Sequence, residues 1–403
     1  MRGGLHTRGS ILGVVFPWVV PCKRTCGFQR REEAPVMNKS ENLTTAVGRR
    51  SFLKTTLGGM VALAVAGGTV PALAASKELI AAASKEGELT WLDAIMVPES
   101  VKVFEKAFKK EYGLPDSFKI NHQRLATGAI ATRVTEEVRA NRVTIDIFAA
   151  ATPAFFADLK DANALLRYDS PEYKYYSQAR KVGLPYEPSY WQSAIAFTQI
   201  PLTNPKIYPK KITSWYDLLD PGLKGGKISL PTVAAGGGPL NSYVGWRKVL
   251  PKSYFVDLAK QRVTYDQGSS VDATQQLLQG NTLVAVTAAF RIIQAAEQSG
   301  VELVAHFPKE GVLLLGQPYG ILAKAPHPNA AKLFIDFLYS EQGQKLYVDL
   351  EGVITLRDGM KVPDKIKKYS PPISDINAIP MDWKKLDSQT LKQYQDEFKD
   401  IFQ

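Results

Sequence analysis

The feature that most constrains this chain is an alternation, beginning near Leu79, between short β-rich runs and longer amphipathic segments. Residues 98–112 illustrate the second kind, because their apolar side chains recur at the spacing of one helix face until Gly113 ends the run. The first part of the sequence predicts strands over residues 89–92, 118–121 and 144–149 and helices over 98–112 and 129–142. Strands and helices in this order predict an α/β fold with parallel pairing and helices on both sheet faces.

Two extended runs, residues 193–198 and 313–323, lie about 120 residues apart. Between them the alternation restarts, with predicted strands over 227–230 and 284–287 and a helix over 238–250, and a further helix over 329–339 follows. The 329 residues from position 75 onward are too many for one compact core. We therefore expect two lobes joined by two crossovers that form a hinge. Lobe 1 is assigned residues 75–196 and 317–403, and lobe 2 residues 197–316, with the C-terminal helices free to pack back on lobe 2.

The beginning of the chain has the three parts of a twin-arginine export signal. Arg49 and Arg50 precede Ser-Phe-Leu-Lys, an apolar run over residues 57–70 follows, and small residues surround Ala74. The run is rich in Gly and Ala and shorter than the roughly 20 residues of a spanning helix, which disfavours the alternative of a membrane anchor. We expect a signal over residues 37–74, export by the Tat translocase, and a free protein in the periplasm.

Residues 1–36 fit neither the signal nor the fold. They place a second apolar block ahead of a complete signal, so we expect synthesis to start at Met37 and treat 1–36 as a non-native extension, a genuine extension being the alternative. Both cysteines, Cys22 and Cys26, fall in this part, which leaves no disulfide, no lipid-anchoring cysteine and no cysteine nucleophile after residue 74.

The charge balance also changes once the signal is removed. Ten of the 50 Lys and Arg residues and three of the 39 Asp and Glu residues precede residue 75, leaving 40 against 36 and a net charge of about +4. Nucleic-acid binding needs a basic face or stripe, and these charges are dispersed along the chain. We therefore expect no nucleic-acid partner.

Several segments resemble one known family. The segment from Ala325 to Lys345 resembles the helix and turn near the C-terminus of type II extracellular solute-binding proteins of ABC importers. Further similarities, in the family's order, lie at residues 88–113, 144–152, 215–230 and 268–280, and residues 381–383 resemble the end of its ferric-iron and phosphonate branch. The resemblance implies two α/β lobes that close over one small molecule, a monomer that presents this molecule to a permease and its ATPase subunits, no cofactor and no enzymatic activity.

Metal ligands of the iron-binding members are missing at the matching positions. Fe(III) prefers phenolate and carboxylate oxygens. In the resemblance, the tyrosine pair of those proteins corresponds to Ala289 and Phe290, and their histidine falls near Met96 or Val97. A second tyrosine pair, at residues 175–176, lies in a polar stretch and is interpreted as surface. The histidines at 122, 306 and 327 are scattered singly, which is typical of structural residues.

The residues at and around the predicted ligand site suit an anion better than a metal ion. Arg291 follows a predicted strand of lobe 2, where a guanidinium can hold a carboxylate or phosphonate, although an ordinary salt bridge is equally consistent with this position. Thr232 and the glycines Gly236 and Gly237 precede a predicted helix, whose N-terminal N–H groups attract anions. In lobe 1, Thr127 and Gly128 stand before a helix in the same way.

Four more residues complete the predicted ligand site. Ala151 and Thr152 end the third strand, where small side chains leave room and a hydroxyl can donate a hydrogen bond. Asp93 follows the first strand and is a candidate partner for an amine, or else a turn residue. Tyr319 lies near a crossover, as does Trp191, and each is a candidate stacking platform or a hinge-packing aromatic.

The sequence therefore predicts the binding component of an ABC importer for a small carboxylate, phosphonate or sugar phosphate. A ferric-iron or polyamine binder of the same fold, and a ligand sensor, are the alternatives. An enzyme is disfavoured, because no cysteine, nucleophile motif or cluster of histidine with carboxylates accompanies the fold.

Overall fold

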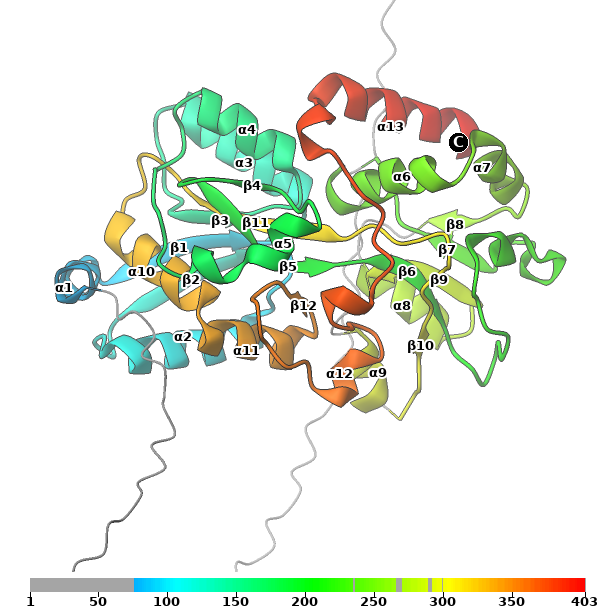
Figure 1. Cartoon of the computed structure of the whole chain (residues 1–403), viewed down its shortest axis with the longest axis horizontal. Coiled ribbons are helices and arrows are strands. Elements are labelled where there is room, and N and C mark those ends of the chain that lie inside the picture. The colour runs from blue at the N-terminus through cyan, green and yellow to red at the C-terminus, as the bar shows by residue number, and fades with distance from the viewer. Residues whose placement is uncertain (1–75, 235, 266–269, 289–291, 299, 403) are drawn as a thin grey trace, which may run out of the picture. The chain divides into compact units, whose positions relative to one another are not determined.

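A computed structural model describes residues 76–402 except 235, 266–269, 289–291 and 299 (Figure 1). The expected export signal, its cleavage site and residues 1–36 lie outside the described residues. In the part of the chain that is described, no helix combines the length and the apolar character needed to span a bilayer.

Lobe 1 is built on a sheet of seven strands in the order β12-β5-β11-β3-β1-β2, with β4 paired to β5. The strands are β1 (Glu88–Asp93), β2 (Lys119–Arg124), β3 (Ile147–Ala149), β4 (Tyr186–Glu187), β5 (Trp191–Phe197), β11 (Leu315–Ile321) and β12 (Ile354–Thr355). β1 pairs in parallel with both β2 and β3, which confirms the pairing expected from the alternation. β11 is antiparallel to β3 and to β5, so the sheet is mixed.

Helices cover both faces of this sheet, because its central strands alternate between two apolar cores. Trp91 belongs to the core that includes Phe334, whereas the next residue, Leu92, belongs to the core that includes Phe148 and Phe156. Figure 1 shows α3 and α4 on one side of the sheet and α2, α10 and α11 on the other. The helices of lobe 1 are α1 (Lys77–Glu86), α2 (Pro98–Tyr112), α3 (Thr127–Arg139), α4 (Pro153–Asp161), α5 (Ser177–Lys181), α10 (Pro328–Tyr339) and α11 (Glu341–Glu351), with a 3-10 turn at Tyr173–Tyr175.

Lobe 2 contains a five-stranded sheet in the order β10-β6-β9-β7-β8. Its strands are β6 (Gln199–Thr203), β7 (Ile228–Leu230), β8 (Thr264–Tyr265), β9 (Val284–Ala288) and β10 (Val304–Ala305). Its helices are α6 (Gly237–Val249), α7 (Lys252–Ala259), α8 (Ser270–Leu278) and α9 (Ile292–Gln298), and 3-10 turns lie at Trp215–Leu219 and Pro221–Leu223. Aromatic packing fills the interior under α6, where the Trp215 and Trp246 rings lie 5.1 Å apart. The two-lobed α/β prediction is confirmed.

The lobes are connected by three passages of chain, one more than the sequence predicted. β5 continues through Thr198 into β6, and residues 306–314 lead from β10 back to β11. The C-terminal segment then crosses again, because Arg357 pairs with Glu172 in lobe 1 whereas Lys368 pairs with Glu297 in lobe 2. This segment carries α12 (Asp364–Lys367), 3-10 turns at Ile373–Asp375 and Trp383–Lys385, and α13 (Ser388–Phe402), which packs against α6 and α7.

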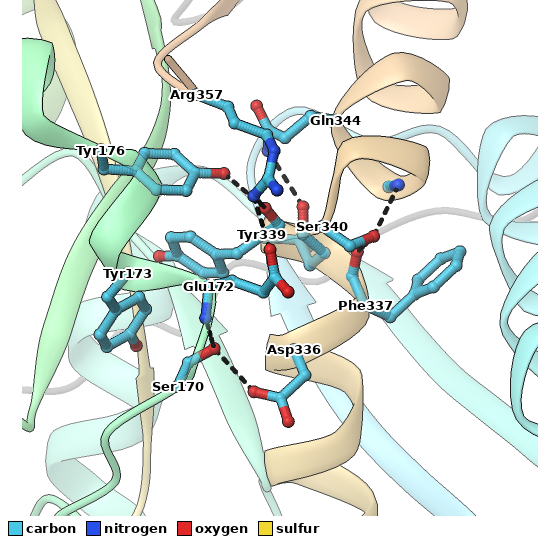
Figure 2. Close-up of polar contacts among 12 residues, drawn as sticks. Ser170, Glu172, Tyr173, Tyr176, Asp336, Phe337, Tyr339, Ser340, Gln344 and Arg357 are labelled. Carbon is cyan, nitrogen blue, oxygen red and sulfur yellow. Dashed lines mark hydrogen bonds and ion pairs between the residues drawn. The ribbon is translucent and has the colours of Figure 1, made fainter. Parts of the chain in front are cut away.

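A buried polar cluster in lobe 1 corrects one expectation. Tyr176 is fully buried, not on the surface, and its hydroxyl donates to the Tyr339 carbonyl at 2.9 Å. The Arg357 guanidinium donates to the same carbonyl and pairs with Glu172 at 2.6 Å (Figure 2). The local run around residues 175–176 is polar, but the aromatic side chains of α10 bury it. Asp336 completes the cluster, and burial raises the pKa of its carboxyl to about 6.

Candidate functional site

Three helices begin where the two lobes approach each other. They are α3 at Thr127, α4 at Pro153 and α6 at Gly237, and none of them has a side-chain hydrogen bond at its N-cap or an acidic residue in its first turn. The first N–H groups of a helix have no partner within the helix and carry part of its positive dipole end. These three N-termini can therefore accept negative charge from outside the helix.

Two of these N-termini touch across the lobes. Gly237 adopts a left-handed φ of +61°, and a Cβ placed on it would lie 2.9 Å from Thr127 Cβ. Real Cβ atoms do not approach another carbon so closely, so the residue must be glycine for the lobes to meet in this way. The sequence nominated both residues independently, and the structure brings them together. Gly128 follows as the half-buried second residue of α3.

The third N-terminus is tied to α6 by a residue that the sequence did not single out. The Asn241 side chain donates to the Ala151 carbonyl at 2.7 Å, and both residues are buried. Ala151 immediately precedes Thr152, the half-buried N-cap of α4. A buried amide needs a partner, but neither the burial of Asn241 nor its partner can be read from the local sequence.

On the lobe 2 side, a glycine-rich loop leads into α6. Thr232 lies half-buried after β7. Gly236 combines a φ of 67° with a ψ of −150°, a conformation open essentially only to glycine. Gln395 of α13 donates to the Ala234 carbonyl at 2.9 Å, so the C-terminal helix braces this loop. This contact could not be predicted from the sequence, because it depends on where the third crossing of the chain ends.

The predicted residues Asp93 and Tyr319 lie elsewhere, in the interior of lobe 1. Each is 0% exposed, and the Tyr319 hydroxyl donates to Asp93 Oδ2 at 3.2 Å. Asp93 Oδ1 accepts from the N–H groups of Ile95 and Met96. Trp191 is 5% exposed, and its ring packs 5.6 Å from that of Phe156. Asp93 and Tyr319 therefore present no surface to a ligand in this conformation, whereas Trp191 lines the cavity beside α4 that is described below.

Two predictions remain, the cation Arg291 and the alternative of a metal site. Arg291, together with Ala289 and Phe290, lies outside the described residues. Among the residues that are described, no group of three or more His, Cys, Asp or Glu side chains gathers as a metal site would require. His306 is buried and takes part in the lobe 2 core, where burial and the Lys211 charge lower its pKa to about 4.

A cavity of about 400 Å³ lies beside α4, between lobe 1 and the C-terminal segment. Its charged lining has five carboxylates and two cations: Asp158, Asp161, Glu187, Asp382, Asp387, Lys160 and Arg180. Lys160 is paired with Glu187. Burial, reinforced by the neighbouring charge of Asp161, raises the pKa of Asp158. The cavity is therefore suited to a cation, in contrast to the helix N-termini.

Two α/β lobes connected by crossover strands define the class of two-lobed binding proteins. The model of the family described as bacterial extracellular solute-binding protein matches residues 99–349, and the chain belongs to this family. The family is described as extracellular and solute-binding, so the class of this protein is that of a solute-binding protein. No curated protein matches the chain closely enough to count as a relative.

Solved structures support the fold. Iron-bound HitA from Pseudomonas aeruginosa is 18% identical with a TM-score of 0.63, over 78% of this chain and 99% of that one. AfuA from Actinobacillus pleuropneumoniae, with exogenous fructose-6-phosphate bound, is 18% identical with a TM-score of 0.66, over 78% and 98%. A substrate-binding protein of an ABC transporter from Agrobacterium tumefaciens is 12% identical with a TM-score of 0.65, over 78% and 94%. At these identities the similarity concerns the fold alone.

Proposed function

We propose that this protein captures a small organic anion between its lobes, at the N-termini of α3, α4 and α6, and delivers it to an ABC permease. The ligand is a carboxylate, a phosphonate or a sugar phosphate. The protein acts as a monomer in the periplasm, which it reaches through the Tat translocase, and Arg291 adds a cation to the lobe 2 side of the site.

The meeting of three uncapped helix N-termini carries this proposal. Thr127 touches Gly237, and Asn241 holds the loop that enters α4, so the starts of all three helices lie near one another. No carboxylate occupies any of these first turns. An anion placed there gains from each helix dipole, whereas a cation is repelled. AfuA, with its sugar phosphate, shows that a protein of this fold can hold such an anion.

The closed arrangement explains how one ligand brings the lobes together. A ligand stabilises the closed state only if it interacts more strongly with that state than with the open one. An anion that accepts hydrogen bonds from α3 and α4 in lobe 1 and from α6 in lobe 2 meets this condition. Closure needs no covalent chemistry, and rotation about the crossovers is sufficient.

A second candidate, a diamine or polyamine ligand, is favoured by the cavity beside α4. Five carboxylates against two cations give its lining a net charge of −3, and Tyr186 and Trp383 add aromatic surface. Aromatic faces attract ammonium groups, and a cation would relieve the repulsion between Asp158 and Asp161. In this reading the principal ligand occupies the cavity, and the helix N-termini only form the lobe contact.

A binding screen separates the two candidates. The chain from residue 75 is unfolded, freed of ligand, refolded and titrated calorimetrically with a dicarboxylate, an alkylphosphonate, a sugar phosphate, ferric citrate and spermidine. We expect one organic anion to bind and to stabilise the protein by about 2.7 kcal/mol at a hundredfold excess over its Kd. Binding of spermidine alone, or of ferric citrate alone, would overturn the anion proposal.

Two variants locate whichever ligand is found. Asn241→Ala removes the contact between α6 and the loop before α4, and it should weaken an anion held at the N-termini. Asp158→Asn, combined with Asp161→Asn, reduces the negative charge of the cavity and should weaken a polyamine instead. The pair of variants serves as reciprocal controls, since Asn241 does not line the cavity, and Asp158 and Asp161 lie beyond the first turn of α4.

A further inference from the structure

Gln199 is a buried polar side chain at the start of β6, and its acceptor oxygen is not used. The residue is 7% exposed, and its Oε1 has no hydrogen-bond partner within the described residues. A buried acceptor without a donor destabilises the folded state, and native proteins as a rule satisfy such an atom with another group. The surroundings of Gln199 indicate which group this is.

Gln199 points to the face of the lobe 2 sheet that α6 covers. β6 is antiparallel to β9, with Gln199 opposite Ala288 and Pro201 opposite Val286. Opposite residues of such a ladder, and alternate residues of one strand, share a face of the sheet. Val286 lines the same apolar space as Tyr243 of α6. The side chain of Gln199 is therefore on the α6 side as well.

Gln199 also lies at the edge of the sheet where α6 begins. Ala288 ends β9, which is parallel to β7, and the loop after β7 leads into α6 at Gly237. Phe197, two positions before Gln199, is close to this N-terminus, because a Cβ on Gly238 would lie 3.4 Å from its ring. Ligands of open α/β sheets bind at the carboxyl ends of the strands. The unpaired oxygen is thus beside the uncapped first turn of α6, on the ligand side of the sheet.

Other unpaired polar atoms in the described part of lobe 2 do not share this position. Ser242 and Trp246 belong to the second and third turns of α6. Thr282 lies just before β9, at the amino end of that strand. Gln199 differs from these three residues because it combines an unpaired acceptor with the end of the sheet that carries the helix N-terminus.

We propose that Gln199 is a specificity-determining residue that accepts a hydrogen bond from a hydroxyl group of the ligand. This inference rests on the proposed anion site and narrows its ligands to hydroxylated anions, either hydroxy acids or sugar phosphates. A hydroxyl suits this acceptor better than an ammonium group does, because the neighbouring helix N-termini repel positive charge. The last torsion of a glutamine side chain is broad, so the amide can turn its oxygen toward such a group.

The first measurement uses the protein without ligand, prepared from residue 75 and refolded as in the screen. Gln199→Met removes the amide oxygen and keeps an unbranched side chain of similar length. Because the acceptor is unpaired in the free protein, its loss should leave the midpoint of thermal unfolding unchanged or raise it. A lowered midpoint would show that Gln199 already has a partner inside the protein, and the inference would be wrong.

The second measurement compares, by calorimetric titration, each anion that binds in the screen with its deoxy form. Malate with succinate and glycerol phosphate with propyl phosphate are the first pairs, one for each source of the hydroxyl. The hydroxyl pairs an acceptor that is otherwise unsatisfied, so the parent protein should bind the deoxy form about 5-fold to 150-fold more weakly. Gln199→Met should bind both members of a pair equally. Ser242→Ala, the matched control on α6, should keep the preference of the parent.

The outcomes separate this inference from the proposed function. Equal binding of both members of a pair by the parent protein, or a preference that survives in Gln199→Met, would overturn the role of Gln199 and leave the anion proposal intact. If no anion in the screen binds, the proposed function itself is refuted, and the inference about Gln199 with it.

Discussion

Replacing Gly237 by alanine tests whether the contact between α3 and α6 is part of the ligand-bound state. The new Cβ would lie 2.9 Å from Thr127 Cβ and 3.0 Å from Thr127 Cγ2. Carbon atoms pack best at about 3.5–4.0 Å, so these positions must separate by roughly half an ångström or more. The clash exists only when the lobes are together, and the variant therefore acts on closure.

The substitution has two costs, which can be separated. Alanine in the left-handed region, here a φ of +61°, costs about 1–2 kcal/mol whether the lobes are open or closed. Overpacking against Thr127 adds about 1–3 kcal/mol in the closed state alone. Only the second cost reduces ligand affinity, and it corresponds to a loss of about 5-fold to 150-fold in Kd.

Gly87→Ala is the matched control, because Gly87 also has a positive φ, +75°, but nothing lies within 4 Å of its added Cβ. Calorimetric titration with the ligand from the screen should show weaker binding for Gly237→Ala only, while thermal unfolding shows similar destabilisation of both variants. Thr127→Gly in the Gly237→Ala background removes the clashing atoms and should restore much of the affinity. Equal affinity of Gly237→Ala and Gly87→Ala would refute the reasoning.

Three further predictions concern single side chains. Asn241→Ala leaves the buried Ala151 carbonyl without its donor when the lobes are closed, so ligand affinity should fall about 5-fold to 150-fold by titration. Ser242→Ala, whose hydroxyl has no hydrogen-bond partner among the described residues, should change the affinity little. Burial raises the folded-state pKa of Asp336 from 3.8 to about 6, so its contribution to the unfolding free energy falls by about 2 kcal/mol as pH rises from 4 to 6, and Asp336→Asn should remove that decline in denaturant titrations. Burial lowers the pKa of His306 from 6.5 to about 4, so its contribution has the opposite sign: about 3 kcal/mol is lost as pH falls from 6.5 to 4, and His306→Gln should abolish that loss. An unchanged pH slope in either variant would contradict its assignment.

The sequence predicted the elements of the fold well, because their signals are local. The apolar spacing of residues 98–112 and the β-rich run at residues 89–92 need no knowledge of the rest of the chain. The glycine run before α6 was also informative, since a run of glycines indicates unusual backbone angles, and Gly236 and Gly237 both have them. Boundaries were less accurate, as α3 begins at Thr127 and not at residue 129.

The interpretation of polar side chains was harder, because it depends on contacts between distant segments. Asp93 follows a strand, as ligand-binding residues do, but Gln317 and Tyr319, more than 200 positions away, turn it into a buried acceptor. Tyr176 is buried for a similar reason, through α10. Asn241 could not be selected among the many Asn residues before its partner Ala151 was known.

The third crossing bears on how accurately the site can close. β5 and β11 are neighbours in one sheet, so the two crossovers form a two-stranded ribbon, and such a ribbon can bend and also twist. The C-terminal segment attaches lobe 1 to lobe 2 a third time, with Lys368 paired to Glu297 of lobe 2, and it is also bridged to the second crossover through Ala378 and Val312. Rotation of one lobe about the long axis of the ribbon would move this third attachment sideways. The attachment therefore opposes twisting of the ribbon more than bending. Closure restricted in this way returns Thr127 to the same place against Gly237, which a contact of about 3 Å between the lobes requires.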